Sequence, residues 1–243
     1  MRIAVISDIH GNLHALDAVL AAVDGDSPDA VWCLGDLVGY GPRPNACTRE
    51  VAARAGICLA GNHDLGVLGR LDLLEFSPEA AIAARWSAVV LEPERRAFLE
   101  GLESTAHAGE VGLYHASPRD PVWEYVLTPD AALLAFEASD DPFVLVGHSH
   151  VPLAISFDGA ELDGGHAPGG MSIELDRARR WLLNPGSVGQ PRDGDPRAAY
   201  LVLDLDARRA DFRRVDYPIG RTQAEIRERG LPESLAARLE LGV

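Results

Sequence analysis

Residues 2–10 read Arg-Ile-Ala-Val-Ile-Ser-Asp-Ile-His, so a short apolar run passes directly into a carboxylate and an imidazole. A run of this kind predicts a strand that is buried on both faces, as the strands of a parallel sheet usually are. Asp8 and His10 alternate in the extended segment, so their side chains project to the same side and can hold one cation. This segment therefore predicts both a parallel sheet and a metal site at its edge.

The segments that follow repeat a strand–helix–strand pattern. Apolar residues at helical spacing predict a helix over residues 11–24, and a second apolar strand is expected over residues 30–34. A helix over residues 43–55 and a strand over residues 57–60 continue the pattern. This alternation indicates an α/β fold in which helices pack on a parallel sheet.

The rest of the chain divides into a helical part and a β-rich part. Residues 65–103 carry no strand signal, and Pro78 and Pro93 each begin a helical stretch, so we expect a helical insertion or cap there. Short helices are expected in a tail over residues 218–243, and the absence of a linker predicts a single domain over residues 1–243. A second, partly antiparallel sheet is predicted from the strands 109–115, 143–147, 151–158, 170–176, 180–183 and 198–206. A helix is expected over residues 129–139, between the first two of these strands.

The composition argues against several classes of protein. The 243 residues carry a net charge of −15, with the 47% hydrophobic and 24% charged fractions of an ordinary globular protein. An acidic chain is not expected to bind nucleic acid, but a small phosphorylated substrate is compatible with it because bound metal ions reverse the local charge. The chain has three cysteines and no Cys-x-x-Cys pair, so neither a disulfide framework nor a thiolate zinc site is expected. No segment resembles a signal peptide or a membrane span, so we expect a cytoplasmic protein.

Aspartate, asparagine and histidine residues collect at the ends of the predicted strands. Glycine residues beside them permit sharp turns, and loops at the carboxyl ends of strands form the binding sites of open α/β sheets. Mixed Asp, Asn and His ligands suit Mn, Fe or Zn better than Ca or Mg. These residues exceed the needs of one tetrahedral ion and predict two ions that share a carboxylate. The motifs are Asp8-Ile9-His10, Gly35-Asp36, Gly61-Asn62-His63-Asp64, His115 and Gly147-His148-Ser149-His150.

In this order the motifs resemble those of the calcineurin-like metallophosphoesterases. The opening segment and Asn184-Pro185-Gly186-Ser187-Val188-Gly189 are similar to the small bacterial and archaeal phosphodiesterase branch of that family. The resemblance covers residues 1–206 and implies a four-layer α/β/β/α sandwich. Ala116 departs from the pattern, in which glycine often follows the histidine, but it leaves His115 in place. The resemblance implies two metal ions that share Asp36 as a bridging ligand. The other ligands would be Asp8, His10 and His150 for one ion, and Asn62, His115 and His148 for the other.

The resemblance also implies a phosphohydrolase whose nucleophile is a water or hydroxide between the two metal ions, with no covalent intermediate. His63 would stabilise the transition state or protonate the leaving oxygen, and Asp64 would orient its ring. Tyr40 and Arg192 are candidate substrate contacts, since Tyr40 closely follows Asp36 and a guanidinium pairs well with phosphate. The leading hypothesis is a phosphodiesterase that acts on a small phosphorylated compound.

Several alternatives stay open at this stage. The same site would suit a phosphomonoester or a dinucleoside polyphosphate, and the alternative of another class is a non-catalytic metal-binding scaffold. His63 and every metal ligand are present, which favours an enzyme, because degenerate relatives of this family tend to lack some of them. The segment Asn184–Gly189 is expected to be either a structural turn or a part of the metal site. A homo-oligomer is compatible with the sequence.

Overall fold

The computed structural model describes residues 1–243, and its first strand, β1 (Arg2–Ile6), is buried on both faces. Ile3 lies in an apolar core that both sheets of the molecule contribute to. Ala4 lies in a second core, which is shared with helix α1 (Leu13–Asp26). Because a sheet covers one face of β1 and a helix covers the other, the strand is apolar at every position from Ile3 to Ile6 rather than at alternate ones.

Two mixed six-stranded sheets pack face to face. Their remaining strands are β2 (Ala30–Cys33), β3 (Ala55–Cys58), β4 (Thr105–Ala108), β5 (Val111–Tyr114), β6 (Phe143–Leu145), β7 (Leu153–Phe157), β8 (Leu162–His166), β9 (Ser172–Glu174), β10 (Arg180–Asn184), β11 (Ala198–Asp204) and β12 (Arg209–Val215). The first sheet has the order β3-β2-β1-β11-β12-β9, and the second has the order β4-β5-β6-β10-β7-β8. Each sheet contains three neighbouring parallel strands, which are β3, β2 and β1 in the first and β5, β6 and β10 in the second.

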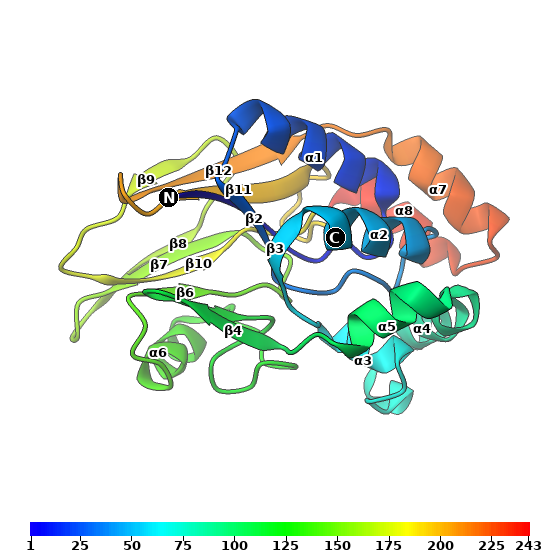
Figure 1. Cartoon of the computed structure of the whole chain (residues 1–243), viewed down its shortest axis with the longest axis horizontal. Coiled ribbons are helices and arrows are strands. Elements are labelled where there is room, and N and C mark those ends of the chain that lie inside the picture. The colour runs from blue at the N-terminus through cyan, green and yellow to red at the C-terminus, as the bar shows by residue number, and fades with distance from the viewer.

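Helices cover the outer surfaces of both sheets (Figure 1). The remaining helices are α2 (Pro44–Arg54), α3 (Asn62–Val67), α4 (Pro78–Val90), α5 (Pro93–Glu100), α6 (Pro129–Glu137), α7 (Ile219–Glu228) and α8 (Glu233–Leu241), with a 3₁₀ turn at Leu73–Glu75. Helix α1 contacts β11 and β12, and α2 contacts β3, whereas α6 packs on the second sheet through Ala132 and Phe136. The predicted α/β sandwich of two sheets flanked by helices is therefore confirmed. The prediction that residues 170–176 and 198–206 form strands of the second sheet is wrong, because β11 pairs with β1 and β9 pairs with β12 in the first sheet.

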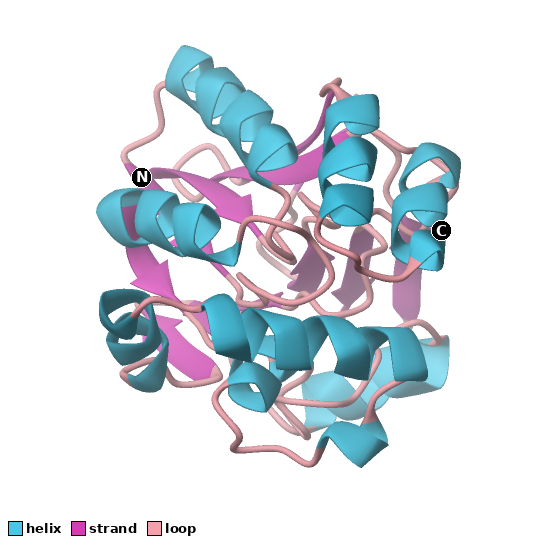
Figure 2. Cartoon of the chain, turned by 90° about the vertical axis from the view of Figure 1, so that its right-hand side faces the viewer, coloured by secondary structure: helices cyan, strands magenta, loops and turns pink.

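The helices of the tail and of the segment before β4 lie on one side of the sandwich. Helix α7 contacts both α1 and α8, and α3 contacts α4. Seen from that side, helices surround a central group of loops (Figure 2). None of the helices combines the length and the apolar character that crossing a membrane requires.

Helices α4 and α5 begin at the two prolines that the sequence analysis used, Pro78 and Pro93. Proline fits the first helical position because its missing N–H would have no intrahelical partner there. Ser77 completes the start of α4, since its side chain accepts a hydrogen bond from the Ala80 amide at 3.3 Å.

Four helices and strands have no counterpart among the predicted ones: α3, β4, β8 and β12. The edge strand β4 lacks an apolar run, and β8 contains Gly164 and Gly165, so neither has the usual strand signal. Both form because a stronger neighbouring strand, β5 or β7, supplies their hydrogen bonds. The strand predicted over residues 57–60 lies instead at Ala55–Cys58, because residues 59–61 already form the loop that leads to α3.

Candidate metal centre

The carboxyl ends of the parallel strands carry the polar residues that the sequence analysis singled out. These strands belong to both sheets, so loops from two separate sheets meet at one place. The residues follow β1 (Asp8 and His10), β2 (Asp36), β3 (Asn62 and His63), β5 (His115) and β6 (His148 and His150).

The ligand-type atoms form two overlapping groups that share Asp36. Within each group, the nitrogen and carboxylate oxygen atoms all lie within 4.8 Å of one another, and every residue is buried. Asn62 joins the second group, because its Oδ1 lies 3.3 Å from Nε2 of His115. The first group is Asp8, His10, Asp36 and His150, and the second is Asp36, His115 and His148.

The rings of His10 and His150 are held so that their lone pairs face each other. Nδ1 of His10 donates to the carbonyl oxygen of Val38 at 3.1 Å, and Nδ1 of His150 donates to that of Gln190 at 2.6 Å. A neutral imidazole with its hydrogen on Nδ1 has an acceptor at Nε2. The two Nε2 atoms are nevertheless only 3.0 Å apart. A cation between them would turn this acceptor–acceptor contact into favourable coordination.

The second group repeats this pattern. Nδ1 of His115 donates to the carbonyl oxygen of Leu34 at 2.8 Å, so its Nε2 is an acceptor that faces another acceptor, Oδ1 of Asn62. Three further buried atoms, Oδ1 of Asp8, Oδ2 of Asp36 and Nε2 of His148, have no hydrogen-bond partner. Buried polar atoms without a partner are costly, so this donor set fits bound divalent cations.

Burial shifts the protonation of these residues. It lowers the pKa of His148 to about 3, with a contribution from His115, and it lowers the pKa of His10 well below its ordinary value. These histidines are therefore neutral near pH 7, which is the form that binds metal. Burial, together with the negative charges of Asp64 and Asp8, raises the pKa of Asp36. A carboxylate whose ionisation is opposed in this way gains most from a neighbouring cation.

The backbone of the site is strained. Six of the eight non-glycine residues with positive φ lie here, and their φ angles fall between 49° and 60°. Residues with a Cβ atom rarely adopt this left-handed conformation. Main-chain hydrogen bonds hold it, for example from the His10 amide to the Asp36 carbonyl at 2.9 Å. The six residues are Asp8, His10, Asp36, Tyr40, His148 and His150.

The segment Asn184–Gly189 satisfies both alternatives that the sequence left open. It forms the turn after β10, and the Ser187 hydroxyl donates to the carbonyl oxygen of Asp8 at 2.8 Å. A Cβ atom at Gly189 would lie 1.9 Å from the carbonyl oxygen of Ile9, so only glycine fits. The segment is therefore a turn that also fixes the backbone of the first motif.

His63 lies beside the clustered ligand atoms, with its ring centroid 4.8 Å from that of His10 and 4.4 Å from that of Tyr40. No hydrogen bond joins the Asp64 carboxylate to this ring, and Nδ1 of His63 has no partner, so the predicted orienting contact is absent. The Asp64 carboxylate instead accepts hydrogen bonds from three main-chain amides, those of Leu37 (2.9 Å), Val38 (3.1 Å) and Gly61 (3.0 Å). Asp64 thus holds the loop that follows Asp36.

A cavity of about 290 Å³ adjoins the site, and Asn62 and His63 form part of its wall. Both predicted substrate contacts line it. Arg192 Nη2 donates to the Tyr40 hydroxyl at 3.3 Å and to Gln190 Oε1 at 2.9 Å. Seven other residues of the wall were not predicted from the sequence, among them Phe76, Trp123, Tyr125 and Arg238. No short motif links these positions, so no sequence signal pointed to them.

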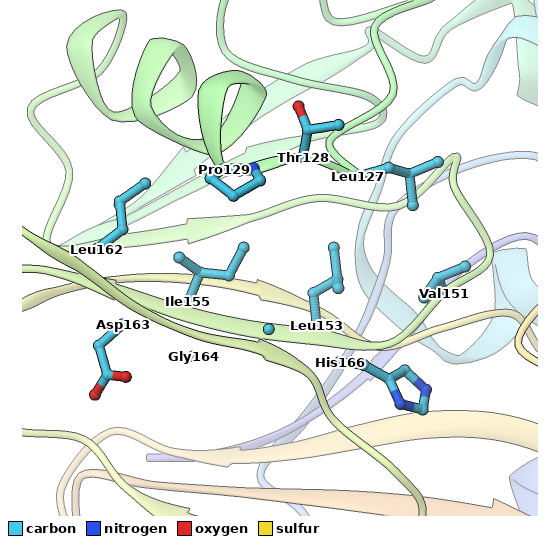
Figure 3. Close-up of a pocket in the computed structure, with 11 residues that line it drawn as sticks. Leu127, Thr128, Pro129, Val151, Leu153, Ile155, Leu162, Asp163, Gly164 and His166 are labelled. Carbon is cyan, nitrogen blue, oxygen red and sulfur yellow. The ribbon is translucent and has the colours of Figure 1, made fainter.

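A second cavity, of about 420 Å³, lies along β7 and β8 (Figure 3). Leu153 and Ile155 point towards Thr128 and Pro129, whereas His166 points away from them. None of the predicted site residues lines this cavity. Four of the predicted site residues instead line the smaller cavity, which are Tyr40, Asn62, His63 and Arg192.

Comparison with known proteins gives the same family as the motifs. Residues 1–208 match the calcineurin-like phosphoesterase superfamily domain. The crystal structure of a metallophosphoesterase from Sphaerobacter thermophilus is 46% identical, with a TM-score of 0.91 over 100% of this chain and 99% of that one. An uncharacterized protein of Methanocaldococcus jannaschii is 40% identical over 99% of this chain and 98% of its own length. Phosphodiesterase YfcE of Escherichia coli is 28% identical over 85% of this chain and 89% of its own length.

The family match covers all the strand-end motifs and every strand except β12 (Arg209–Val215). The resemblance that the motifs suggested, including the similarity to small phosphodiesterases, is confirmed. The chain therefore belongs to the calcineurin-like phosphoesterase superfamily and is a metal-dependent phosphoester hydrolase.

Proposed function

We propose that the protein is a phosphodiesterase that uses two divalent metal ions to cleave a small phosphorylated compound. The observation that carries this proposal is the pair of ligand groups that share Asp36. Bound there, the ions would stabilise charge on the phosphoryl oxygens and lower the pKa of the attacking water. The His, Asp and Asn donors suit Mn²⁺, Fe²⁺ or Zn²⁺. Similarity to the Escherichia coli phosphodiesterase supports a diester as the substrate.

The contacts support a division of the residues into two sets. The acceptor–acceptor contact of His10 and His150 supports one binding position, and that of His115 and Asn62 supports the other. Asp36 belongs to both groups and is therefore the proposed shared ligand. In full, we assign Asp8, His10 and His150 to one ion, and Asn62, His115 and His148 to the other.

His63 is the proposed acid that protonates the leaving oxygen or stabilises charge on it. Its ring contacts His10 of the first group and also Phe76 of the cavity wall, at a centroid distance of 5.2 Å. It therefore lies between the proposed metal positions and the space for a substrate. A side chain placed within reach of a reacting oxygen contributes about 10²–10⁴-fold to the rate.

Arg192 is proposed to bind a phosphate group of the substrate, and Tyr40 is proposed to hold that arginine in place through their hydrogen bond. Asp64 is proposed to act indirectly, through the loop that carries Asp36. We further propose that the whole chain works as one domain. In that domain, the helical segment 65–103 shapes access to the site, because Phe76 of this segment lines the cavity.

The test is hydrolysis of bis-p-nitrophenyl phosphate and p-nitrophenyl phosphate by protein that has been chelated and then reloaded with Mn²⁺. Metal-dependent turnover that favours the diester would support the proposal. A preference for the monoester would contradict the proposed substrate class while leaving the metal centre in place. If two ions bind and neither compound is cleaved, the non-catalytic scaffold becomes the better explanation.

A further inference from the structure

Two arginines in the wall of the site cavity have no side-chain carboxylate as a partner. One is Arg192, and the other is Arg238 of helix α8, which lies outside the residues that match the family domain. Arg238 Nε donates to the main-chain oxygen of Val243 at 2.8 Å, and its two Nη groups make no hydrogen bond. Nε of Arg192 is buried without a partner. Glu75 lines the same cavity but forms no ion pair with either guanidinium.

Two guanidinium groups face this one cavity although the chain as a whole is acidic, with 37 acidic side chains against 22 arginines. The two guanidinium groups also repel each other. Burial lowers the pKa of Arg238, and the positive charge of Arg192 adds to that effect. Like charges that converge on one cavity raise the local concentration of anions. Their free N–H groups match the geometry of a phosphate.

Aromatic side chains form much of the remaining wall. Trp123 and Phe76 pack edge to face, with ring centroids 5.1 Å apart. Tyr125 stacks on His148 at 4.2 Å, with only 16° between the ring planes, and 47% of its surface remains exposed. Exposed aromatic faces bind planar rings by stacking. The cavity therefore combines an anion-binding subsite with aromatic surfaces that suit a planar group.

We propose that Arg192 and Arg238 bind a second phosphate of the substrate, separate from the phosphoester that is cleaved, in a molecule that also carries a planar ring. This inference rests on the proposed phosphodiesterase function. It gives the tail helix α8 a role in substrate selection, because α8 supplies one of the two guanidinium groups.

The test uses two substrates that differ in one group. Thymidine 3′-(p-nitrophenyl phosphate) is compared with the same compound carrying a 5′-phosphate, so the diester, the leaving group and the planar base are identical. Release of p-nitrophenolate by the Mn²⁺-loaded protein gives kcat/KM for each. We expect the 5′-phosphate to raise kcat/KM by about tenfold or more, because charge-assisted hydrogen bonds of this kind are strong.

Variants at Arg238 test whether its guanidinium group causes the preference for the 5′-phosphorylated substrate. Arg238→Ala is expected to lower kcat/KM for the 5′-phosphorylated substrate about tenfold more than for the 5′-hydroxyl substrate, and Arg238→Lys to restore part of that difference. Arg229→Ala removes the same charge from an exposed position of the tail and should leave the ratio unchanged. Equal losses on both substrates would overturn the inference, since Arg238 would then bind the scissile phosphate.

A binding measurement separates this inference from the proposed function. Titration calorimetry with the Mn²⁺-loaded protein compares thymidine 3′,5′-bisphosphate with thymidine 3′-phosphate. If neither diester is cleaved, the proposed function fails, but tighter binding of the bisphosphate that Arg238→Ala abolishes would still support the second subsite. Equal affinities, or no detectable binding of the bisphosphate, would overturn the inference whatever the turnover.

Discussion

His10 and His150 place two acceptor nitrogens 3.0 Å apart, because each ring donates its single hydrogen to a main-chain carbonyl. This contact is unfavourable unless a cation lies between the rings. Removal of metal by chelation is therefore expected to lower the free energy of unfolding by about 3–4 kcal/mol for each ion lost, for ions present at 100 to 1,000 times their Kd. Thermal unfolding before chelation, after it, and after Mn²⁺ is returned measures this change. An unchanged Tm after complete removal of the ions would contradict the proposed site.

The sharing of Asp36 by both groups predicts different metal contents for two variants. Asp36→Asn should leave less than one ion per chain, because both positions lose a charged ligand. His148→Asn should leave about one, since only the second group contains that ring. Elemental analysis of gel-filtered protein measures both values. Two ions retained by Asp36→Asn would exclude a shared ligand at this position.

His63→Ala should lower turnover about 10²-fold or more while the metal content stays that of the unaltered protein. The reason is that His63 borders the substrate cavity but does not belong to either group of clustered ligand atoms. His107→Ala serves as the matched control, because its imidazole lies on β4 and outside the site cavity. A variant at His63 with full activity would remove this residue from the mechanism.

Two glycine substitutions are expected to change stability in opposite directions. Gly189→Ala would place a Cβ atom 1.9 Å from the carbonyl oxygen of Ile9, so the backbone of the first motif must move. A loss of about 2 kcal/mol or more is expected, as for other overpacked buried sites. Gly25→Ala meets nothing within 4 Å near the end of α1 and should gain about 0.5–1 kcal/mol. Urea unfolding of both variants measures the two changes.

Glu225 makes the attachment of the tail dependent on pH. Its carboxylate accepts hydrogen bonds from Arg43 Nε and Nη2, both at 2.6 Å, and lies 3.1 Å from Nε2 of His14. Chiefly because of Arg43, the pKa of Glu225 is held below its ordinary value of 4.5. A lowered pKa stabilises the folded state above pH 4.5, and that contribution is lost as the pH falls through the folded-state pKa.

Glu225→Gln should therefore cost about 1 kcal/mol at pH 7, and this difference from the unaltered protein should shrink below pH 4.5. Urea unfolding at several pH values measures it. Glu228→Gln is the control, because Glu228 is exposed on the same helix and makes no ion pair. A difference that persists unchanged at low pH would show that the carboxylate charge contributes nothing.

The sequence was informative wherever the relevant residues lie close together along the chain. Asp8 and His10 both follow β1, and the parallel topology that an apolar run such as 2–6 predicts brings such ends to a common edge. The extended backbone predicted for these two residues is wrong, because both have positive φ angles and their amides donate to the loop carbonyls of Gly35 and Asp36. The residues of the cavity wall, by contrast, lie far apart in the sequence. Trp123 and Arg238 come from a loop and from the tail, and their meeting depends on tertiary packing that no local pattern encodes.

The interpretation of Asp64 failed for a local reason. The family resemblance implied that Asp64 would orient the ring of the adjacent His63. The helix α3, which the sequence analysis did not predict, begins at Asn62. Successive residues of an α-helix point in directions roughly 100° apart, so the two side chains diverge. The carboxylate meets the amides of the neighbouring loop instead of the imidazole.

The left-handed backbone at the proposed ligands has an evolutionary consequence. Each such residue strains the chain by about 1–2 kcal/mol, which glycine would relieve, and the buried Asp8 and Asp36 repel each other. Without metal, glycine at these positions would relieve the backbone strain. Selection for the reaction, rather than for folding, must therefore preserve them. In a lineage that is no longer under this selection, substitutions that relieve the strain would accumulate and give a protein with the same fold but no activity.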